Sequence, residues 1–182
     1  MRESDHLAGT GRVVVLTGTG KGKTTAALGA SLRAMAYHGK VVFIHFTGPQ
    51  YPDLGEVKAS AAYLDSLRMV GIKSEAGQAS YLAGFSESVD TVSDALTMAR
   101  KVWMHQCDLM VLADIGSQLE KGNIDVDQVL SLIEDKPKNM SIILTGRSMP
   151  SEINVRADSV TEFTEVKRPS SASVGPRKGI DF

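Results

Sequence analysis

The sequence predicts an α/β fold in which a mostly parallel central sheet carries helices on both faces. Short runs of β-branched and other apolar residues alternate along the chain with segments whose apolar residues recur every three or four positions. Such runs are typical of strands buried on both faces, and the segments between them are typical of amphipathic helices. This alternation favours crossover connections between parallel strands.

The first half of the chain supplies three predicted strands and two predicted helices. The sequences RVVVLT at 12–17 and KVVFIHF at 40–46 predict buried strands, and a short third strand is predicted at 71–74. Residues 23–37 predict an alanine-rich helix with leucine and methionine at helical spacing. Residues 56–69 predict a second helix, which leads to the third strand.

The second half begins with an expected loop at 77–88 and continues the alternation. Apolar residues at steps of three and four predict a helix from Val89 to Trp103. A second helix is predicted after Asp125, whose side chain is expected to cap it together with Gln128 three residues later. A short helix is predicted at 150–156, and the remaining strands are predicted at 108–113, 140–145 and 159–163.

Polar sequences follow three of these predicted strands. They are the stretch from Thr17 to Thr25, the single Asp114, and the tripeptide Thr145-Gly146-Arg147. In open parallel sheets, ligands bind at the carboxyl ends of the strands. The sequence therefore predicts that these groups converge on one site.

Composition and charge narrow the class of protein. The 182 residues are 42% hydrophobic and 23% charged, with 20 basic and 21 acidic side chains. This near balance does not favour binding to nucleic acid or to an anionic membrane. Histidines at 6, 38, 45 and 105 lack the spacing of metal ligands, and no apolar run is long enough to span a bilayer.

The chain is expected to consist of a flexible lead at 1–11 and a single domain at 12–182. The lead carries mixed charges and no hydrophobic stretch, unlike a signal peptide. The single cysteine, Cys107, precedes a buried strand and is expected to act as a small apolar residue. A chain that forms no internal disulfide is expected to be cytoplasmic.

The strongest motif lies between the first predicted strand and the first predicted helix. There the chain reads Gly18, Thr19, Gly20, Lys21, Gly22, Lys23, Thr24 and Thr25. Glycines let backbone amides turn toward a phosphate, and a helix N-terminus adds positive potential. This strand–turn–helix context predicts a phosphate-binding P-loop, although Thr17 stands where the common pattern has glycine. The alternative is a glycine-rich turn without a ligand.

Individual residues of this motif have distinct expected roles. Lys23 is expected to bind the outer phosphates, and the Thr24 hydroxyl is expected to ligate Mg²⁺. Lys21 either contacts phosphate or is solvated. Asp114 ends an apolar strand and is expected to be a second magnesium ligand; the alternative is a residue that caps the next turn. Arg147 is expected to bind phosphate through its guanidinium, unless it is an ordinary surface arginine.

These residues resemble the BtuR/CobO/CobP family of ATP:corrinoid adenosyltransferases from about Arg12 to the C-terminus. The resemblance rests on four stretches. They are TGTGKGKTTAA at 17–27, Arg33 followed by HGKV at 38–41, IILTGR at 142–147 leading to Pro150 and Ala157-Asp158, and EVK at 165–167 with the tail KGIDF at 178–182.

The resemblance implies a RecA-like P-loop fold and transfer of the 5′-deoxyadenosyl group of ATP to the cobalt of a reduced corrinoid, with release of triphosphate. It implies Mg²⁺, a homodimer and an electron-donor flavoprotein as partner. It adds Arg33 and Phe85 to the binding residues. Without the family comparison, Arg33 reads as a solvated or ion-paired helix residue and Phe85 as a packing anchor.

The chain departs from the family at two positions of the expected site. The family has Asp-Glu at the end of its acidic strand, where this chain has Ala113-Asp114. The family has Gly-Phe-Thr-Trp in the loop under the corrinoid, where this chain has Gly84-Phe85-Ser86-Glu87. These substitutions motivate a second hypothesis, in which the chain binds or hydrolyses ATP but has lost the transfer reaction.

Overall fold

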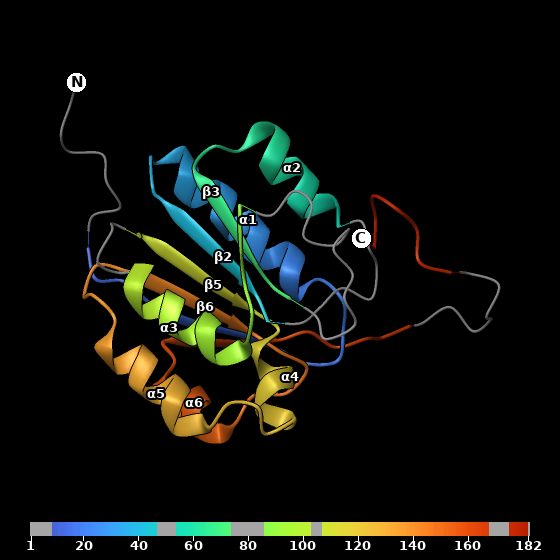
Figure 1. The fold of residues 1–182 in the computed structure, drawn as a ribbon. Coiled ribbons are helices and arrows are strands. Elements are labelled where there is room, and N and C mark those ends of the chain that lie inside the picture. Colours follow the sequence, from blue (N-terminus) through green and yellow to red (C-terminus); the bar gives the residue numbers. More distant parts are fainter. Residues whose placement is uncertain (1–8, 47–53, 74–85, 103–106, 168–174, 182) are drawn as a thin grey trace.

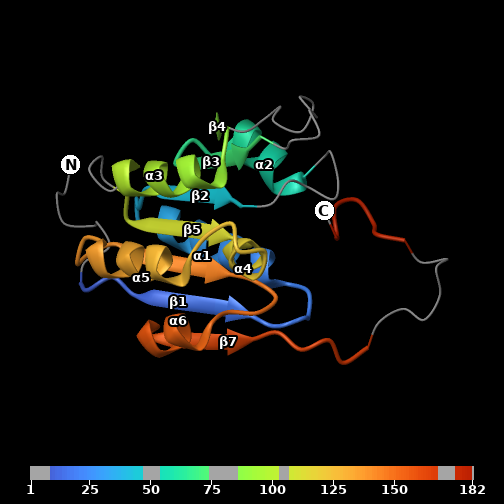
Figure 2. The same cartoon turned by 60° about the horizontal axis from the view of Figure 1, so that its bottom comes forward.

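A seven-stranded parallel sheet forms the centre of the computed structural model, which describes residues 9–46, 54–73, 86–102, 107–167 and 175–181. The strands in chain order are β1 (Val13–Thr17), β2 (Val41–His45), β3 (Leu67–Ile72), β4 (Glu87–Val89), β5 (Leu109–Ala113), β6 (Ser141–Thr145) and β7 (Ser159–Glu162). They lie in the order β4-β3-β2-β5-β6-β1-β7, and Figures 1 and 2 show the sheet from two sides. Because β6 separates β1 from β5, the sheet has the strand arrangement of RecA-like P-loop folds.

Helices cover both faces of this sheet, as the sequence predicts. One face packs on α1 (Lys23–Ala36) and α2 (Gly55–Tyr63), and the other packs on α3 (Val92–Val102), α5 (Val126–Asp135) and α6 (Ser151–Arg156). A further short helix, α4 (Ile115–Glu120), follows β5 at the carboxyl edge of the sheet. The predicted fold class is therefore confirmed.

The centre of the sheet supplies most of the buried apolar surface. Every residue of β2 and β5 is buried, as expected for parallel strands with helices on both sides. Phe43, Met110 and Leu144 are completely or almost completely buried among them. This packed centre holds the strand ends, and hence the site at the carboxyl edge, in fixed relative positions.

Two boundaries differ from the sequence prediction in the first half. The helix predicted at 56–69 ends at Tyr63, and β3 begins four residues later at Leu67 instead of at 71. Leu67, Met69 and Val70 are buried and pair with β2, so tertiary pairing overrides the local helical spacing of these residues.

The region after β3 also differs. Residues 87–89, expected at the border of a loop and a helix, form the edge strand β4, and α3 begins at Val92. The helix α4 was not predicted, because six residues show too little periodicity. The capping box is confirmed: the Asp125 amide donates to Gln128 Oε1 at 2.9 Å at the start of α5.

Candidate nucleotide-binding pocket

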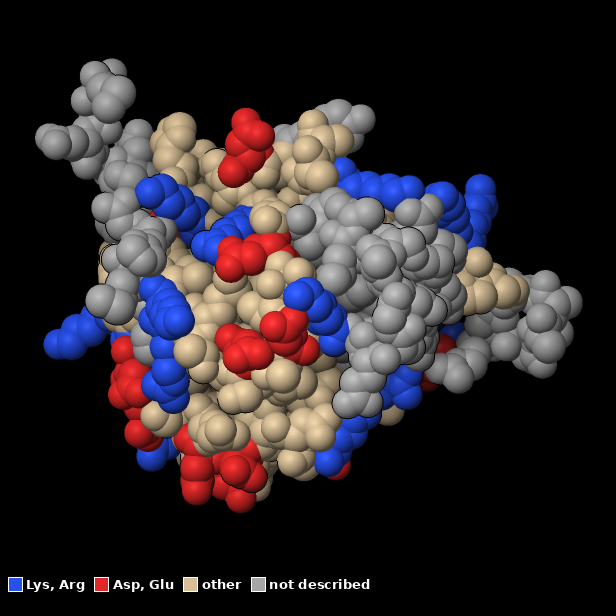
Figure 3. All heavy atoms as spheres, viewed as in Figure 1, with Lys and Arg blue, Asp and Glu red and all other residues tan. Residues whose placement is uncertain are grey.

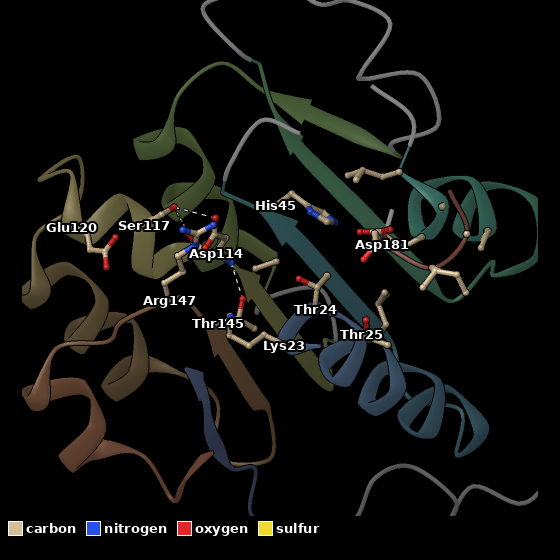
Figure 4. Close-up of a pocket in the computed structure, with 18 of the residues that line it drawn as sticks. Lys23, Thr24, Thr25, His45, Asp114, Ser117, Glu120, Thr145, Arg147 and Asp181 are labelled. Carbon is tan, nitrogen blue, oxygen red and sulfur yellow. Dashed lines mark hydrogen bonds between the residues drawn. The ribbon is translucent and has the colours of Figure 1, made fainter. Parts of the chain in front are cut away.

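A cavity of about 890 Å³ opens at the carboxyl ends of β2, β5 and β6, beside the N-terminus of α1. Figure 4 shows side chains from these strand ends and from α1 facing it, together with Asp181 of the C-terminal tail. Its walls comprise residues from six parts of the chain: Lys23, Thr24, Thr25, Leu28, His45, Leu54, Gly55, Glu56, Ala59, Ala113, Asp114, Ser117, Glu120, Lys121, Thr145, Arg147, Gly179, Ile180 and Asp181. The predicted convergence of polar groups at this edge is thus present.

The glycine-rich loop is braced by neighbouring chain segments. The Gly18 amide donates to the Arg147 carbonyl at 3.1 Å, and the Gly20 amide donates to the Phe163 carbonyl at 2.7 Å. The Phe163 amide in turn donates to the Thr17 carbonyl at 2.8 Å. These bonds tie the loop to the turn after β6 and to the end of β7.

Glycine is required at two of these positions for a steric reason. A Cβ atom at Gly18 would lie 2.4 Å from the Phe163 carbonyl oxygen, and one at Gly20 would lie 2.8 Å from it. Both amides donate to protein carbonyls in this structure, and their contact with a phosphate stays a prediction. Amides farther along the loop and in the first turn of α1 are left to hold an anion.

Lys23 is the first residue of α1, and its half-buried side chain reaches back to the glycine-rich loop. Its Nζ donates to the carbonyls of Gly18 at 2.6 Å and Gly20 at 2.7 Å. Burial lowers the pKa of Lys23, the negative charge of Asp114 raises it, and the positive charge of Arg147 lowers it further. Lys23, Asp114 and Arg147 therefore interact electrostatically. An anionic ligand bound beside Lys23 and Arg147 would offset their positive charges.

Asp114 follows β5 in a left-handed backbone conformation, with φ 61° and ψ 29°. Its amide donates to Thr145 Oγ1 at 2.9 Å, and Ser117 Oγ donates to its carbonyl at 2.8 Å. Ser117 Oγ also lies 3.2 Å from Asp114 Oδ2. Asp114 occupies the N-cap position of α4 without a hydrogen bond from its side chain to the helix backbone, and it lines the cavity, so its role as a metal ligand stays a prediction.

The charges of the cavity favour a metal-bound anion over a free one. Among the described residues, the lining holds four carboxylates, those of Glu56, Asp114, Glu120 and Asp181, against the three cations Lys23, Lys121 and Arg147. A highly charged phosphate chain needs additional positive charge in such surroundings. The Thr24 hydroxyl and the Asp114 carboxylate line the same cavity and are the hard oxygen ligands that Mg²⁺ prefers. The donor set therefore fits magnesium.

Other predicted site residues lie elsewhere. Lys21 forms an ion pair with Asp181 of the C-terminal tail, a partner that the sequence did not indicate. Arg33 is exposed near the end of α1 and does not line the cavity. Ten residues separate it from Lys23, which is about 15 Å along a helix. Its role at the nucleotide stays a prediction, and Phe85 lies outside the described residues.

Several lining residues were not predicted as site residues. His45 ends β2 and is 7% exposed, and burial lowers its pKa to about 4, so it is neutral near pH 7. Ser117 and Glu120 belong to α4, and Gly179 to Asp181 belong to the tail. His45 could have been found from its place at the end of a predicted strand. No sequence pattern brings the tail to this edge.

The parallel sheet, the strand–loop–helix around Lys23 and the acidic residue two strands away define a P-loop nucleotide-binding protein. The model of the family "ATP:corrinoid adenosyltransferase BtuR/CobO/CobP" matches residues 9–182. The chain belongs to this family, so the resemblance predicted from the sequence is confirmed.

Curated relatives agree with this assignment. The chain is 27% identical to a corrinoid adenosyltransferase of Escherichia coli K12 over 180 residues, which cover 94% of this chain and 86% of that protein. It is 30% identical to a corrinoid adenosyltransferase of Sinorhizobium sp, covering 94% of this chain and 80% of that protein. Both relatives are named corrinoid adenosyltransferase, which supports this type of transferase at the level of the family.

Solved structures with a similar chain path include the Hef helicase domain of Pyrococcus furiosus. The identity is 17% and the TM-score 0.49, with 91% of this chain and 36% of that chain covered.

Among the described residues, no helix is long and apolar enough to cross a membrane. Within the same residues, no group of three or more histidine, cysteine or acidic side chains is arranged to hold a metal ion.

Proposed function

We propose that this protein transfers the 5′-deoxyadenosyl group of ATP to the cobalt of a reduced corrinoid and releases triphosphate. The observation that carries the proposal is the meeting of Lys23, Asp114 and Arg147 at one cavity in a chain that belongs to the corrinoid adenosyltransferase family. A triphosphate leaving group needs such a concentration of charged groups.

The reaction requires little acid–base chemistry from the protein. The electron pair of cobalt(I) forms a bond to C5′ of ATP while the C5′–O bond breaks and its electrons pass to the triphosphate. Cobalt becomes formally cobalt(III), and no proton is transferred in this step. The protein must hold C5′ in line with cobalt and stabilise the charge that develops on the leaving triphosphate.

The residues of the cavity suit this second task. Lys23 is expected to exchange its bonds to the Gly18 and Gly20 carbonyls for bonds to phosphate oxygens. Arg147 is exposed at the cavity and is expected to close on the phosphates from the side of β6. Thr24 and Asp114 would hold Mg²⁺, which supplies further positive charge to the leaving group.

The wider setting follows the family and is part of the proposal. The protein is expected to act in the cytoplasm as a homodimer, with a flavoprotein as electron donor for the corrinoid. Phe85 is expected to lie against the corrinoid. The substrates are then small molecules, in keeping with the balanced charge of the chain.

The test is to mix the protein with ATP, Mg²⁺ and chemically reduced cobinamide or cobalamin. The expected result is the spectrum of an alkylated cobalt together with one triphosphate per adenosylated corrinoid. The Lys23→Ala variant is the matched negative control. Phosphate instead of triphosphate as the product would contradict the proposed reaction.

A second candidate function is an ATP-binding or ATP-hydrolysing module without corrinoid transfer. Ala113 favours it, because this residue is 3% exposed and brings no carboxylate to the cavity where the family has aspartate. Glu87 favours it as well, since its carboxylate is engaged by Arg68 on β3. ATP binding without adenosylation of either corrinoid would decide for this second candidate.

A further inference from the structure

Asp114 adopts a backbone conformation that is unfavourable for an L-residue. Its φ of 61° and ψ of 29° lie in the left-handed region, where a residue other than glycine is strained. Aspartate tolerates this region better than most residues, but glycine is the usual choice. A charged residue in this conformation indicates that contacts with the surrounding chain hold the backbone there.

One contact that holds this conformation comes from Thr145, at the end of β6. Its Oγ1 accepts a hydrogen bond from the Asp114 amide at 2.9 Å, and its side chain is 2% exposed. The parallel strands β5 and β6 pair up to Leu112 and Leu144, one residue before the chain of β5 turns away. The Thr145 hydroxyl oxygen therefore accepts from the Asp114 amide just beyond the paired region, where a backbone carbonyl would accept in a continuing ladder.

Backbone contacts leave little freedom for the same turn. The Ala113 carbonyl accepts from the Phe46 amide at 2.9 Å, which fixes the residue before Asp114. A Cβ atom at Gly116 would lie 2.5 Å from the Ser148 carbonyl oxygen, so α4 begins in direct contact with the turn after β6. Because both flanks are fixed, the hydrogen bond from the Asp114 amide to Thr145 determines the direction in which the Asp114 side chain leaves the sheet.

We propose that Thr145 is a positioning residue for metal-dependent nucleotide binding and acts through Asp114. Its hydroxyl oxygen holds the Asp114 amide, which keeps the left-handed turn and directs the carboxylate into the cavity that Lys23 and Thr24 also line (Figure 4). The inference rests on the proposed binding of ATP with Mg²⁺ in this cavity, and it does not require the transfer of the adenosyl group.

Thr145 also lines the cavity itself, so direct contact with the nucleotide is the competing explanation. The two explanations differ in how Thr145 and Asp114 combine. A positioning residue has no effect once the group that it positions is removed, whereas a residue that contacts phosphate acts independently. A double-variant cycle therefore separates them.

The experiment measures ATP affinity by calorimetry with and without Mg²⁺ for Thr145→Val and Thr145→Ser. Valine keeps the shape and removes the acceptor oxygen, while serine keeps the oxygen. Thr145→Val is expected to weaken the binding of ATP with Mg²⁺ roughly tenfold to a hundredfold, the usual range for residues that orient a metal ligand. Binding without Mg²⁺ is expected to stay within about twofold, and Thr145→Ser is expected to restore the metal-dependent affinity.

Two controls complete the test. Ser60→Ala removes another buried hydroxyl, which donates to the Leu67 carbonyl away from the cavity, and is expected to leave both affinities unchanged. In an Asp114→Asn background, Thr145→Val is expected to cause no further loss. Equal losses with and without Mg²⁺, or additive losses in the double variant, would overturn the proposal.

Thr145→Cys serves in place of valine if the valine variant does not fold, because sulfur is a weak acceptor in a small side chain. It is expected to show the same loss confined to Mg²⁺, and full metal-dependent affinity in this variant would contradict the proposal. None of these measurements contains a corrinoid. A protein that binds ATP but has lost the transfer reaction would still show the predicted pattern, so the two failures are distinguishable.

Discussion

The two sides of the sheet differ in what their charged residues contact. On the side of β1 and β6, the loop with Lys23 and the turn with Arg147 face one cavity and are tied together by backbone hydrogen bonds. On the side of β3 and β4, Glu87 is bound to Arg68. The charged groups of the first side face the larger cavity, whereas Arg68 and Glu87 of the second side neutralise each other.

A second, smaller cavity lies on the β4 side. It has a volume of about 330 Å³ and is lined by Arg68, Glu87, Val89, Asp94, Thr97, Met98, Lys101 and Val102. None of these residues lines the nucleotide cavity. The difference teaches that the loop before Lys23 is braced by backbone hydrogen bonds from distant segments, whereas the β4 side carries a contact between two side chains, Arg68 and Glu87.

The largest expected effect comes from Lys23→Ala, on the side of β1 and β6. The variant is expected to bind ATP about a hundredfold more weakly, because a charged donor to phosphate is lost from a partly buried position. Lys21→Ala is the matched control from the same loop: Lys21 is exposed and paired with Asp181, and its loss is expected to change affinity only about threefold. Equal effects of the two variants in calorimetry would remove the distinction between the two lysines.

His45 lies on β2, between the two sides, and is expected to destabilise the protein in acid. Its folded pKa of about 4 lies below the ordinary value of 6.5 because of burial. As the pH falls below 6.5, His45 takes up a proton in the unfolded chain, whereas in the folded chain it stays neutral until about pH 4. The free energy of unfolding is therefore expected to fall by about 3 kcal/mol across this window.

Chemical denaturation at pH 7 and pH 4 measures this change. The His45→Gln variant, which cannot titrate, is the control and is expected to lack that part of the acid sensitivity. An identical loss of stability in both proteins would assign the effect to other groups.

Asp114→Gly is expected to stabilise the fold and to weaken the metal-dependent binding of ATP. Glycine relieves the left-handed strain and is expected to raise the free energy of unfolding by about 1 kcal/mol, while the Mg²⁺ dependence of ATP binding is lost. Asp114→Asn, which tolerates the same backbone but lacks the charge, is expected to lose the Mg²⁺ dependence without the gain. Thermal unfolding and magnesium titrations measure the two effects, and a destabilised glycine variant would show that the turn is not strained.

The smallest effect is expected on the other side of the sheet, with Glu87→Gln. The Arg68–Glu87 pair is about two-fifths exposed, so its loss is expected to lower stability by less than about 1 kcal/mol. ATP affinity is expected to be unchanged, since the pair lies outside the nucleotide cavity. A marked change in ATP affinity would show that the two sides are coupled.

Particular residues illustrate what sequence analysis missed. Local patterns extended the second helix to 69, although Leu67 and Met69 pair with β2 in β3. They also gave no sign that the Gly18 and Gly20 amides donate to carbonyls of distant segments. In both cases a long-range backbone contact decided the conformation.

The sequence by itself determined the α/β class, the loop that carries Lys23, the acidic strand end at Asp114 and the membership of the family. These features depend on local periodicity and on short motifs, which a single segment contains in full. Only the tertiary structure decided that Phe163 braces the loop, that Thr145 holds Asp114 in a left-handed turn and that Asp181 reaches Lys21. The physical reason is that these contacts join residues 31 to 160 positions apart, whose meeting depends on strand order and register.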